Sequence, residues 1–372
     1  MNTEDNNFWV RYGRQMAIPE FGREGQEKLS RGSALVVGAG GLGSPLLYYL
    51  AAAGLGRLGI VDGDRVEASN LHRQILYRSA DVGRLKAEVA AERLRAVNSE
   101  LEVAVYPFHL NSHNALDILD PYEVVADGSD NFPTRYLVND ACLLRGKPDV
   151  YGAVFRFEGQ LSVFNGLDAK GERGPNYRDL HPEPPAAGTV PNCAEAGVLG
   201  VLPGIIGSMQ AAEVIKLITG IGRPLIGRLF LLDASDFRSQ TIRLPKRPDR
   251  PVVNRLIDYE RWCGRPGLPS KSPREARQWA AETHAQWLDV REPFERAEAS
   301  LASAHIPLRE LAGRISELDP ARPLLVFCRS GQRSAQAVRQ LLDEHHFKNV
   351  YNLEGGLLAW RRAGLPLEEP AP

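Results

Sequence analysis

The sequence predicts an α/β protein with a doubly wound, mostly parallel sheet, followed by a second and smaller α/β domain. Short apolar runs alternate with helical patterns through the first part of the chain, which is typical of a parallel sheet. A stretch rich in proline and arginine interrupts this alternation, and the alternation then resumes. With 372 residues the chain is long enough for two cores. We therefore expect a first domain over 1–245, a linker over 246–275 and a second domain over 276–372.

The elements of the first domain follow from the position of the apolar runs. Four runs predict strands, and the last residue of two of them is acidic: Ser33–Val37, Leu58–Asp62, Leu101–Val105 and Val124–Asp127. Three stretches with helical periodicity predict helices: Leu85–Val97, Thr134–Leu144 and Gly204–Thr219. Residues 166–191 are dominated by Gly, Pro and polar residues, which predicts a long surface loop. The smaller domain shows the same pattern, with strands expected at Trp287–Val290 and Leu324–Phe327 and a helix at Ser334–Glu344.

Composition limits the classes of partner and the compartment. The formal net charge is -1, so no basic excess points to nucleic acid. No apolar run approaches the roughly 20 residues that cross a bilayer. The N-terminus lacks the basic-then-apolar order of a signal peptide. The four cysteines are widely spaced, which favours a reducing compartment over a disulfide framework. We expect a cytoplasmic protein that binds neither nucleic acid nor membrane.

A glycine-rich turn follows the first predicted strand. Its glycines are Gly38, Gly40, Gly41 and Gly43, and a helical pattern comes directly after them. Glycines at such a turn let the backbone approach a phosphate, and the helix N-terminus attracts negative charge. Asp62 lies about 20 residues further on, where an acid can bind ribose hydroxyls. These residues alone fit an NAD-binding oxidoreductase and an ATP-binding enzyme equally well.

Polar residues after the ribose acid favour adenylation. Asn70, Arg73, Gln74 and Lys86 follow Asp62, and Asp130 follows the fourth predicted strand. Arg73 and Lys86 can neutralise a triphosphate as charge builds on the pyrophosphate, and Asp130 can hold Mg²⁺. Hydride transfer does not need so many charged groups beside the phosphates.

The sequence resembles the MoeB/ThiF branch of the ubiquitin-activating enzyme family over about residues 8–245. The matching segments are Arg11–Gln15, Phe21–Gln26, Asp130–Asp140, Ala194–Gly200 and Gly207–Ala211. The resemblance implies a Rossmann-like sheet and ATP-dependent adenylation of the C-terminal Gly-Gly of a small ubiquitin-like sulfur carrier protein. It also implies that ATP binds Gly41, Asp62, Asn70, Arg73, Gln74 and Lys86, that Asp130 binds magnesium, and that Arg14 reaches ATP from a partner subunit of a homodimer.

The chain departs from this family at its structural zinc site. The family usually carries two Cys-x-x-Cys pairs, but here those four positions are Asn176, Asp179, Arg250 and Val253. Such a set cannot form a zinc tetrahedron, so we predict no structural zinc. Asp179 and Arg250 are expected to form an ion pair in its place.

Two of the four cysteines, Cys193 and Cys328, are candidate reactive thiols. Cys193 lies at the end of the predicted loop, before a helix whose N-terminus can activate a thiol. The resemblance implies that the matching cysteine forms a covalent link to the carrier, either a thioester or an acyl disulfide. Cys193 is therefore interpreted as a second catalytic thiol, against the commoner fate of a buried filler.

Cys328 follows a buried strand and opens the run Cys328, Arg329, Ser330, Gly331, Gln332, Arg333 before a helix. Backbone N–H groups in such a loop form an anion nest, which favours a thiolate and a persulfide. The arginine comes one position earlier than in cysteine phosphatases, so the loop is too small for phosphate. About residues 276–370 resemble a single-domain rhodanese, supported by Asp289–Glu295 and Glu354–Trp360.

The two signatures together predict adenylation of a carrier, followed by sulfur transfer from a Cys328 persulfide to form a thiocarboxylate. The sulfur donor would be a cysteine desulfurase or thiosulfate. Molybdopterin, thiamine, cysteine and thiocarboxylate-derived secondary-metabolite pathways remain open. The alternatives are a NAD-binding Rossmann oxidoreductase with an accessory sulfurtransferase domain, a non-catalytic scaffold for sulfur relay, and adenylation of a small-molecule or tRNA-linked carboxylate.

Overall fold

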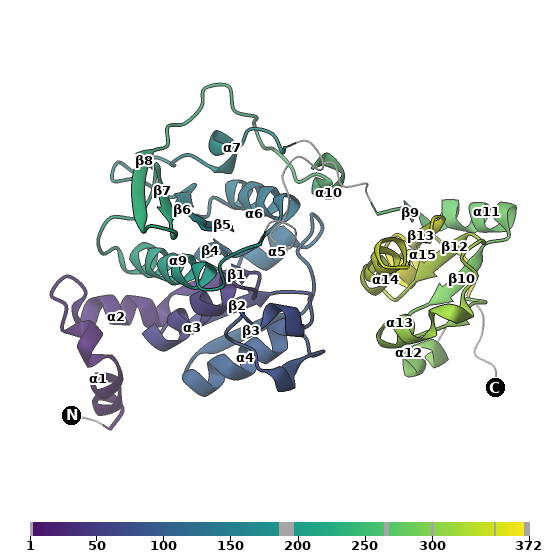
Figure 1. The fold of residues 1–372 in the computed structure, drawn as a ribbon, viewed down its shortest axis with the longest axis horizontal. Helices are drawn as coiled ribbons and strands as arrows, with labels where there is room; N and C mark the ends of the chain where they lie inside the picture. Colours follow the sequence, from purple (N-terminus) through teal and green to yellow (C-terminus); the bar gives the residue numbers. More distant parts are fainter. Residues whose placement is uncertain (1–2, 186–196, 264–267, 299–300, 346, 368–372) are drawn as a thin grey trace. The chain divides into compact units, whose positions relative to one another are not determined.

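The computed structural model divides the chain into two compact units, residues 1–264 and 265–372 (Figure 1). The residues that it describes are 3–185, 197–263, 268–298, 301–345 and 347–367. Both units have an α/β fold, as the sequence predicts, and the elements expected from it are present with ends that differ by one or two residues.

The first unit is organised around an eight-stranded sheet with the order β3-β2-β1-β4-β5-β6-β7-β8. Its strands are β1 (Ser33–Val37), β2 (Arg57–Val61), β3 (Glu102–Tyr106), β4 (Val124–Asp127), β5 (Asp149–Phe155), β6 (Glu158–Phe164), β7 (Arg228–Asp233) and β8 (Arg238–Arg243). The strands from β3 to β5 pair in parallel, and β5 to β8 pair in antiparallel fashion. The chain order reverses between β1 and β4, and ligands of doubly wound sheets bind at such a switch point.

Helices cover both faces of this sheet (Figure 1). They are α1 (Thr3–Met16), α2 (Gly22–Arg31), α3 (Gly43–Ala53), α4 (Lys86–Val97), α5 (Ala115–Leu119), α6 (Phe132–Arg145), α7 (Tyr177–Leu180), α9 (Leu202–Thr219) and α10 (Tyr259–Trp262), with short 3₁₀ turns at Ala68–Asn70 and Ser79–Asp81. Helices α3, α4 and α9 pack on one face, and α5, α6 and α10 pack on the other.

The residues of β1 explain why this strand lies at the centre. Ala34 and Val36 enter the core under α3 and α9, whereas Leu35 and Val37 enter the core under α6. All five residues of the strand are buried, which matches a continuous apolar run with helices on both sides.

Two polar stretches are more ordered than their composition predicts. Within the expected surface loop over 166–191, residues 174–179 are buried, and α7 lies among them. The reason is that Tyr177 packs edge-on against Tyr136 of α6, with 4.9 Å between ring centroids. Within 246–275, where a linker is expected, Tyr259 is buried in the core of the first unit.

The second unit has a five-stranded parallel sheet with the order β11-β10-β12-β13-β9. Its strands are β9 (Ser270–Lys271), β10 (Gln286–Asp289), β11 (Ala304–His305), β12 (Leu324–Phe327) and β13 (Val350–Leu353). Its helices are α11 (Pro273–Thr283), α12 (Pro293–Glu298), α13 (Leu311–Arg314), α14 (Gln332–Asp343) and α15 (Gly356–Arg362), with 3₁₀ turns at Leu308–Glu310 and Ile315–Glu317. Helices α13 and α14 lie over one core, and α11 and α15 lie over the other.

In the described part of the chain, no helix combines the length and the apolar character needed to cross a membrane.

Candidate functional site

The glycine turn after β1 is held tightly against its own backbone. Gly38 has a φ of +91°, which favours glycine. A Cβ on Gly43 would lie 2.0 Å from the Gly38 carbonyl oxygen. Helix α3 therefore begins directly at the turn, and its first N–H groups lie next to the end of β1.

Asp62, directly after β2, is fixed by the same turn. One carboxylate oxygen accepts a hydrogen bond from the Ala39 N–H at 2.8 Å, and the other accepts from the Asp64 N–H at 2.8 Å. Burial raises the pKa of Asp62, while the Lys86 ammonium opposes that rise. The predicted ribose acid thus lies beside the predicted phosphate turn.

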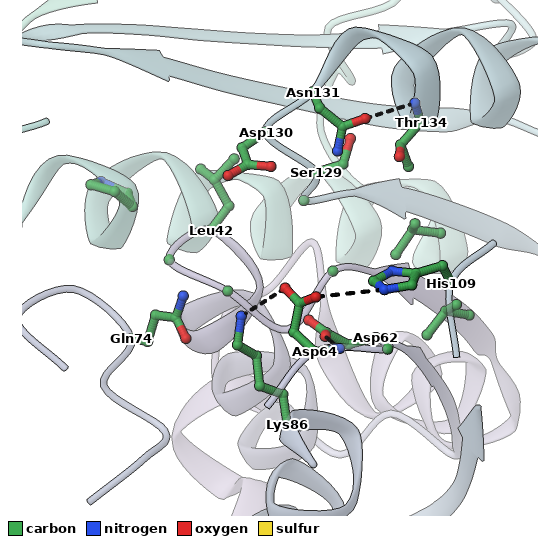
Figure 2. Close-up of a pocket in the computed structure, with 18 of the residues that line it drawn as sticks. Leu42, Asp62, Asp64, Gln74, Lys86, His109, Ser129, Asp130, Asn131 and Thr134 are labelled. Carbon is green, nitrogen blue, oxygen red and sulfur yellow. Dashed lines mark hydrogen bonds and ion pairs between the residues drawn. The ribbon is translucent and has the colours of Figure 1, made fainter. Parts of the chain in front are cut away.

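Lys86 is buried at the start of α4, and its Nζ donates to Asp64 Oδ2 at 3.0 Å (Figure 2). Burial alone would lower the pKa of Lys86, but the Asp62 and Asp64 carboxylates outweigh it and raise that pKa. Asp64 also faces His109, with 3.6 Å between Oδ1 and Nε2. Sequence reasoning assigned no role to Asp64, although the Asp-x-Asp spacing after β2 was visible.

The turn that carries Asp130 is held in place by hydrogen bonds of the neighbouring residues. Asp127 accepts a hydrogen bond from the Ser129 N–H at 2.8 Å, and Arg135 donates to the Ser129 carbonyl at 3.3 Å. Asn131 caps α6 by accepting from the Thr134 N–H at 3.0 Å. The turn is therefore fixed on both sides of Asp130, whose carboxylate faces the pocket (Figure 2).

These elements line one pocket of about 220 Å³ at the switch point of the sheet. The pocket brings together eight of the residues that the sequence predicts for ATP and magnesium: Gly38, Gly40, Gly41, Asp62, Arg73, Gln74, Lys86 and Asp130. Three predicted residues do not line it. Asn70 instead accepts a hydrogen bond from Arg73 at 2.7 Å, Gly43 begins α3, and Arg14 is exposed on α1.

The pocket fits a polar ligand. The buried side-chain oxygens Gln74 Oε1 and Ser129 Oγ line it and have no hydrogen-bond partner within the described ranges. Unpaired buried polar atoms are costly, so they indicate a partner from outside the chain. Asp130 supplies the oxygen chemistry that Mg²⁺ prefers, and Lys86 and Arg73 supply the cations that a triphosphate needs.

A second site lies at the end of β12 in the smaller unit. Cys328 is buried, and its Sγ accepts hydrogen bonds from the Gly331 N–H at 3.2 Å and from Ser334 Oγ at 3.4 Å. Gly331 has a φ of +87°, and a Cβ on Gly356 would lie 2.3 Å from the Cys328 carbonyl oxygen. The loop over 328–333 is thus pressed against the turn that precedes α15 and closes around the sulfur atom.

The last predicted residue of this loop is tied to another element. Arg333 donates to both carboxylate oxygens of Glu295 in α12, each at 2.6 Å. This interaction lowers the pKa of Glu295 to about 2. Sequence reasoning missed both Glu295 and Ser334 as partners of the loop, and nothing in the spacing alone connects residue 295 to residue 333. Cys193, the other predicted catalytic thiol, lies outside the described residues.

The positions of the family's zinc cysteines contain a hydrogen-bonded ion pair. Arg250 Nη1 lies 2.8 Å from Asp179 Oδ2, which confirms the predicted pair. The Asp179 carboxylate also accepts from the backbone N–H groups of Asn176 and Arg247, each at 2.7 Å. In the described ranges, no three His, Cys, Asp or Glu side chains gather in a way that could hold a metal ion. The donor set at this place does not fit zinc.

Comparison with known proteins identifies two domains in the chain. A model of the ThiF family matches residues 12–252, and a model of the rhodanese-like domain matches residues 272–363. The chain belongs to the ThiF family. Its ThiF domain contains the glycine-turn pocket, and its rhodanese-like domain contains the Cys328 loop.

Relatives of this ThiF-family chain cover most of its length. The sulfur carrier protein adenylyltransferase of Thermus thermophilus is 57% identical over 260 residues, which are 68% of this chain and 96% of the relative. The probable adenylyltransferase/sulfurtransferase MoeZ of Mycobacterium tuberculosis is 42% identical over 369 residues, 96% of this chain and 94% of the relative. Among solved structures, E. coli MccB with MccA-N7isoASN has a TM-score of 0.57 at 20% identity, covering 66% of this chain and 74% of that chain, which shows the fold.

Proposed function

We propose that this chain adenylates the C-terminal Gly-Gly of a ubiquitin-like sulfur carrier protein and then converts that carboxylate to a thiocarboxylate with sulfur held on Cys328. The chain is an adenylyltransferase and a sulfurtransferase, as its two domains and its relatives indicate. The observation that carries the proposal is the pairing, on one chain, of the pocket around Lys86 and Asp130 with the closed loop around Cys328.

In the first half-reaction, the ThiF domain binds MgATP as substrate. Asp62 holds the ribose hydroxyls, the glycine turn and the N-terminus of α3 face the phosphates, and Asp130 holds the magnesium ion. Lys86 and Arg73 stabilise the negative charge that develops on pyrophosphate as the carrier carboxylate attacks the α-phosphorus. Because Asp64 already orients Lys86, the Lys86 ammonium is in position before ATP binds.

The carrier tail enters from the apolar edge of the pocket. Val154, Val198 and Pro203 line the pocket and are what we call its apolar edge. Phe157 and Val201, close to these residues in the sequence, are exposed apolar side chains. Two glycines in sequence lack side chains that could collide with this edge, so the terminal carboxylate can reach the α-phosphorus. This match between an apolar edge and a side-chain-free tail favours a protein carrier over a small polar acid.

In the second half-reaction, the Cys328 persulfide attacks the acyl-adenylate, and AMP leaves with the electron pair of the broken acyl–oxygen bond. The product is an acyl disulfide on Cys328. A second thiol, for which Cys193 is the candidate, attacks the sulfur of Cys328, forms a disulfide with it and releases the thiocarboxylate. A cellular thiol then reduces that disulfide. Holding both domains on one chain raises the effective concentration of the persulfide at the adenylate.

The partner assignments complete the proposal. The working unit is a homodimer in which Arg14 reaches ATP of the partner subunit, because Arg14 lies exposed on α1 and outside its own pocket. No structural zinc is bound, because Asp179 and Arg250 form an ion pair with each other at the positions of the family's zinc cysteines. The compartment is the cytoplasm.

The test is exchange of radiolabelled pyrophosphate into ATP, with and without a small protein that ends in Gly-Gly. Exchange that requires both the carrier and magnesium is expected. A carrier whose last glycine is removed is the matched control and is expected to be inactive. Exchange supported equally by a free small carboxylic acid, and not by the carrier, would contradict the proposal.

A further inference from the structure

One of the two arginines of the Cys328 loop has its charge cancelled by a residue outside the loop. The loop carries two arginines, Arg329 and Arg333, and both terminal nitrogens of Arg333 are bound to Glu295 at 2.6 Å. A bidentate arginine–carboxylate pair is geometrically specific and charge-assisted. The pair is partly sheltered from solvent, because the Glu295 side chain is 15% exposed and the Arg333 side chain 35% exposed.

Glu295 is not free to leave Arg333. Arg291 donates to the Glu295 carbonyl at 2.8 Å, and the backbone N–H of Glu292 donates to Glu295 Oε2 at 3.1 Å. Arg291 is itself bound through its guanidinium to Asp289, which is fully buried at the end of β10. A chain of contacts therefore runs from the central sheet to the carboxylate that holds Arg333.

The remaining charges around the sulfur atom are few. Arg329 is exposed and forms no ion pair within the described ranges, whereas Glu292 lies near Arg333 and is itself paired with Arg309 at 3.2 Å. Ser334 and the Gly331 N–H contribute uncharged hydrogen bonds to Sγ. The loop can thus stabilise the single negative charge of a thiolate or a persulfide. For a sulfur donor with two negative charges, Arg329 is the only unpaired positive charge that the described part of the loop provides.

We infer that Glu295 is a specificity-determining residue of the Cys328 loop. Its carboxylate cancels the charge of Arg333, so the loop accepts sulfur from a cysteine persulfide on a donor protein in preference to a small dianion such as thiosulfate. This inference rests on the proposed role of Cys328 as the sulfur carrier of the rhodanese-like domain. It names the class of donor that the sequence leaves open.

The chemistry of the two donors differs in charge and not in oxidation state. With a protein persulfide, the Cys328 thiolate attacks the terminal sulfur, the donor S–S bond breaks, and the donor cysteine leaves as a thiolate. With thiosulfate, the same attack on the outer sulfur breaks the S–S bond and releases sulfite. The second reaction brings a dianion against a thiolate, so it depends more strongly on positive charge at the loop.

The test is a charge cycle in the full chain with Glu295→Gln, Arg333→Met and the double variant. Glutamine keeps an oxygen that accepts from Arg333 but removes the negative charge. We expect Glu295→Gln to lower KM for thiosulfate about tenfold, which is the effect of one unit charge at short range in a partly solvated site. Arg333→Met leaves Glu295 unpaired and raises KM by a similar factor, and the double variant returns KM close to the wild-type value.

Two further readouts separate charge from structure. The pH dependence of alkylation at Cys328, resolved by mass spectrometry, should shift to lower pH in Glu295→Gln and to higher pH in Arg333→Met. Transfer from a persulfide-loaded cysteine desulfurase should change much less than transfer from thiosulfate in Glu295→Gln. Glu310→Gln is the matched control, because Glu310 pairs with Arg314 and Arg309 and, among the described residues, forms no hydrogen bond or ion pair with the loop over 328–333.

A double variant as impaired as Arg333→Met, or an alkylation profile in Glu295→Gln identical to that of the wild type, would overturn the inference and leave Glu295 a structural residue. The proposed function fails by a different result, namely a wild-type chain that gains no persulfide at Cys328 from either donor. The alkylation profiles still decide the charge cancellation in that case, because they need no sulfur donor.

Discussion

The two candidate sites begin in the same way and end with opposite properties. Each lies where a central parallel strand, β1 or β12, ends in a turn that requires glycine and leads into a helix. After β1 the turn opens onto a pocket whose lining includes buried oxygens without partners and the exposed carboxylate of Asp130. After β12 the turn closes around one sulfur atom, and Arg333 of this turn is already paired with Glu295.

This contrast shows how the same strand–turn–helix arrangement supports two different reactions. A nucleotide is large and polyanionic, so its site contains polar groups whose hydrogen-bond partner is the ligand, and positively charged side chains beside the phosphates. A persulfide is a single small anion, and backbone N–H and hydroxyl groups are enough to bind it. The turn provides the position, and the pairing of the surrounding charges determines which anion the site accepts.

The largest expected effect comes from removing the sulfur atom that the second turn surrounds. Cys328→Ala should abolish thiocarboxylate formation, while carrier-dependent pyrophosphate exchange stays within about twofold of wild type because the two pockets use separate residues. Mass spectrometry of the carrier measures thiocarboxylate formation, and the exchange assay measures adenylation. Cys263→Ala, which changes a cysteine packed beside the core of the first unit, is the control. Equal loss of exchange in Cys328→Ala would show that the sites are not separable.

The reciprocal change removes the magnesium ligand of the open site. Asp130→Asn should reduce pyrophosphate exchange by about 10²–10³-fold, as expected when one electrostatic contact to developing charge is lost. Persulfide loading of Cys328 should be unchanged. Asp120→Asn, which alters an acid paired with Arg145 on the surface, is the control. Exchange at the wild-type rate in Asp130→Asn would remove this residue from the magnesium site.

A smaller effect is expected where an ion pair takes the place of the family's zinc. Asp179→Ala leaves Arg250 and two backbone N–H groups without their acceptor, so the free energy of unfolding of the ThiF domain should fall by about 1–3 kcal/mol. Asp249→Ala breaks the exposed pair with Arg247 and should cause no measurable change. Thermal unfolding with and without a chelator measures both. A wild-type protein destabilised by the chelator would contradict the absence of zinc.

The smallest effect is the pH dependence of the Glu295–Arg333 pair. The pKa of Glu295 falls from 4.5 to about 2 on folding, mainly through its hydrogen bonds to Arg333. A lowered folded-state pKa stabilises the protein above the unfolded value, and that stability is lost as pH falls from about 4.5 towards 2. The difference in unfolding free energy between wild type and Glu295→Gln should therefore narrow over this range. A difference that widens on acidification would mean that the pair does not stabilise the fold.

The sequence could predict the fold class and much of both sites because those features are local. Gly38, Asp62 and Cys328 each follow an apolar strand directly, so their positions come from the strand pattern alone. Two partners could not be found in this way. Asp64 meets Lys86 across 22 residues and Glu295 meets Arg333 across 38, and only the packed sheet brings such pairs together.

Composition also misled in one region. Residues 166–191 contain many prolines and glycines and predict a surface loop, yet 174–179 are buried. The buried segment depends on the edge-on contact of Tyr177 with Tyr136 and on Arg178 binding Asp140 Oδ1 at 2.9 Å. These contacts join α7 to α6 between residues that are far apart in the sequence, and no local sequence pattern predicts them.

The central claim is that the open site and the closed site act in succession on one carrier. The most direct measurement is mass spectrometry of a Gly-Gly carrier after a single turnover with MgATP and persulfide-loaded enzyme. Wild type should yield the thiocarboxylate, Cys328→Ala should stop at the acyl-adenylate, and Asp130→Asn should return the carrier unchanged. Thiocarboxylate formed by Cys328→Ala without added sulfide, or by Asp130→Asn at the wild-type rate, would contradict the account.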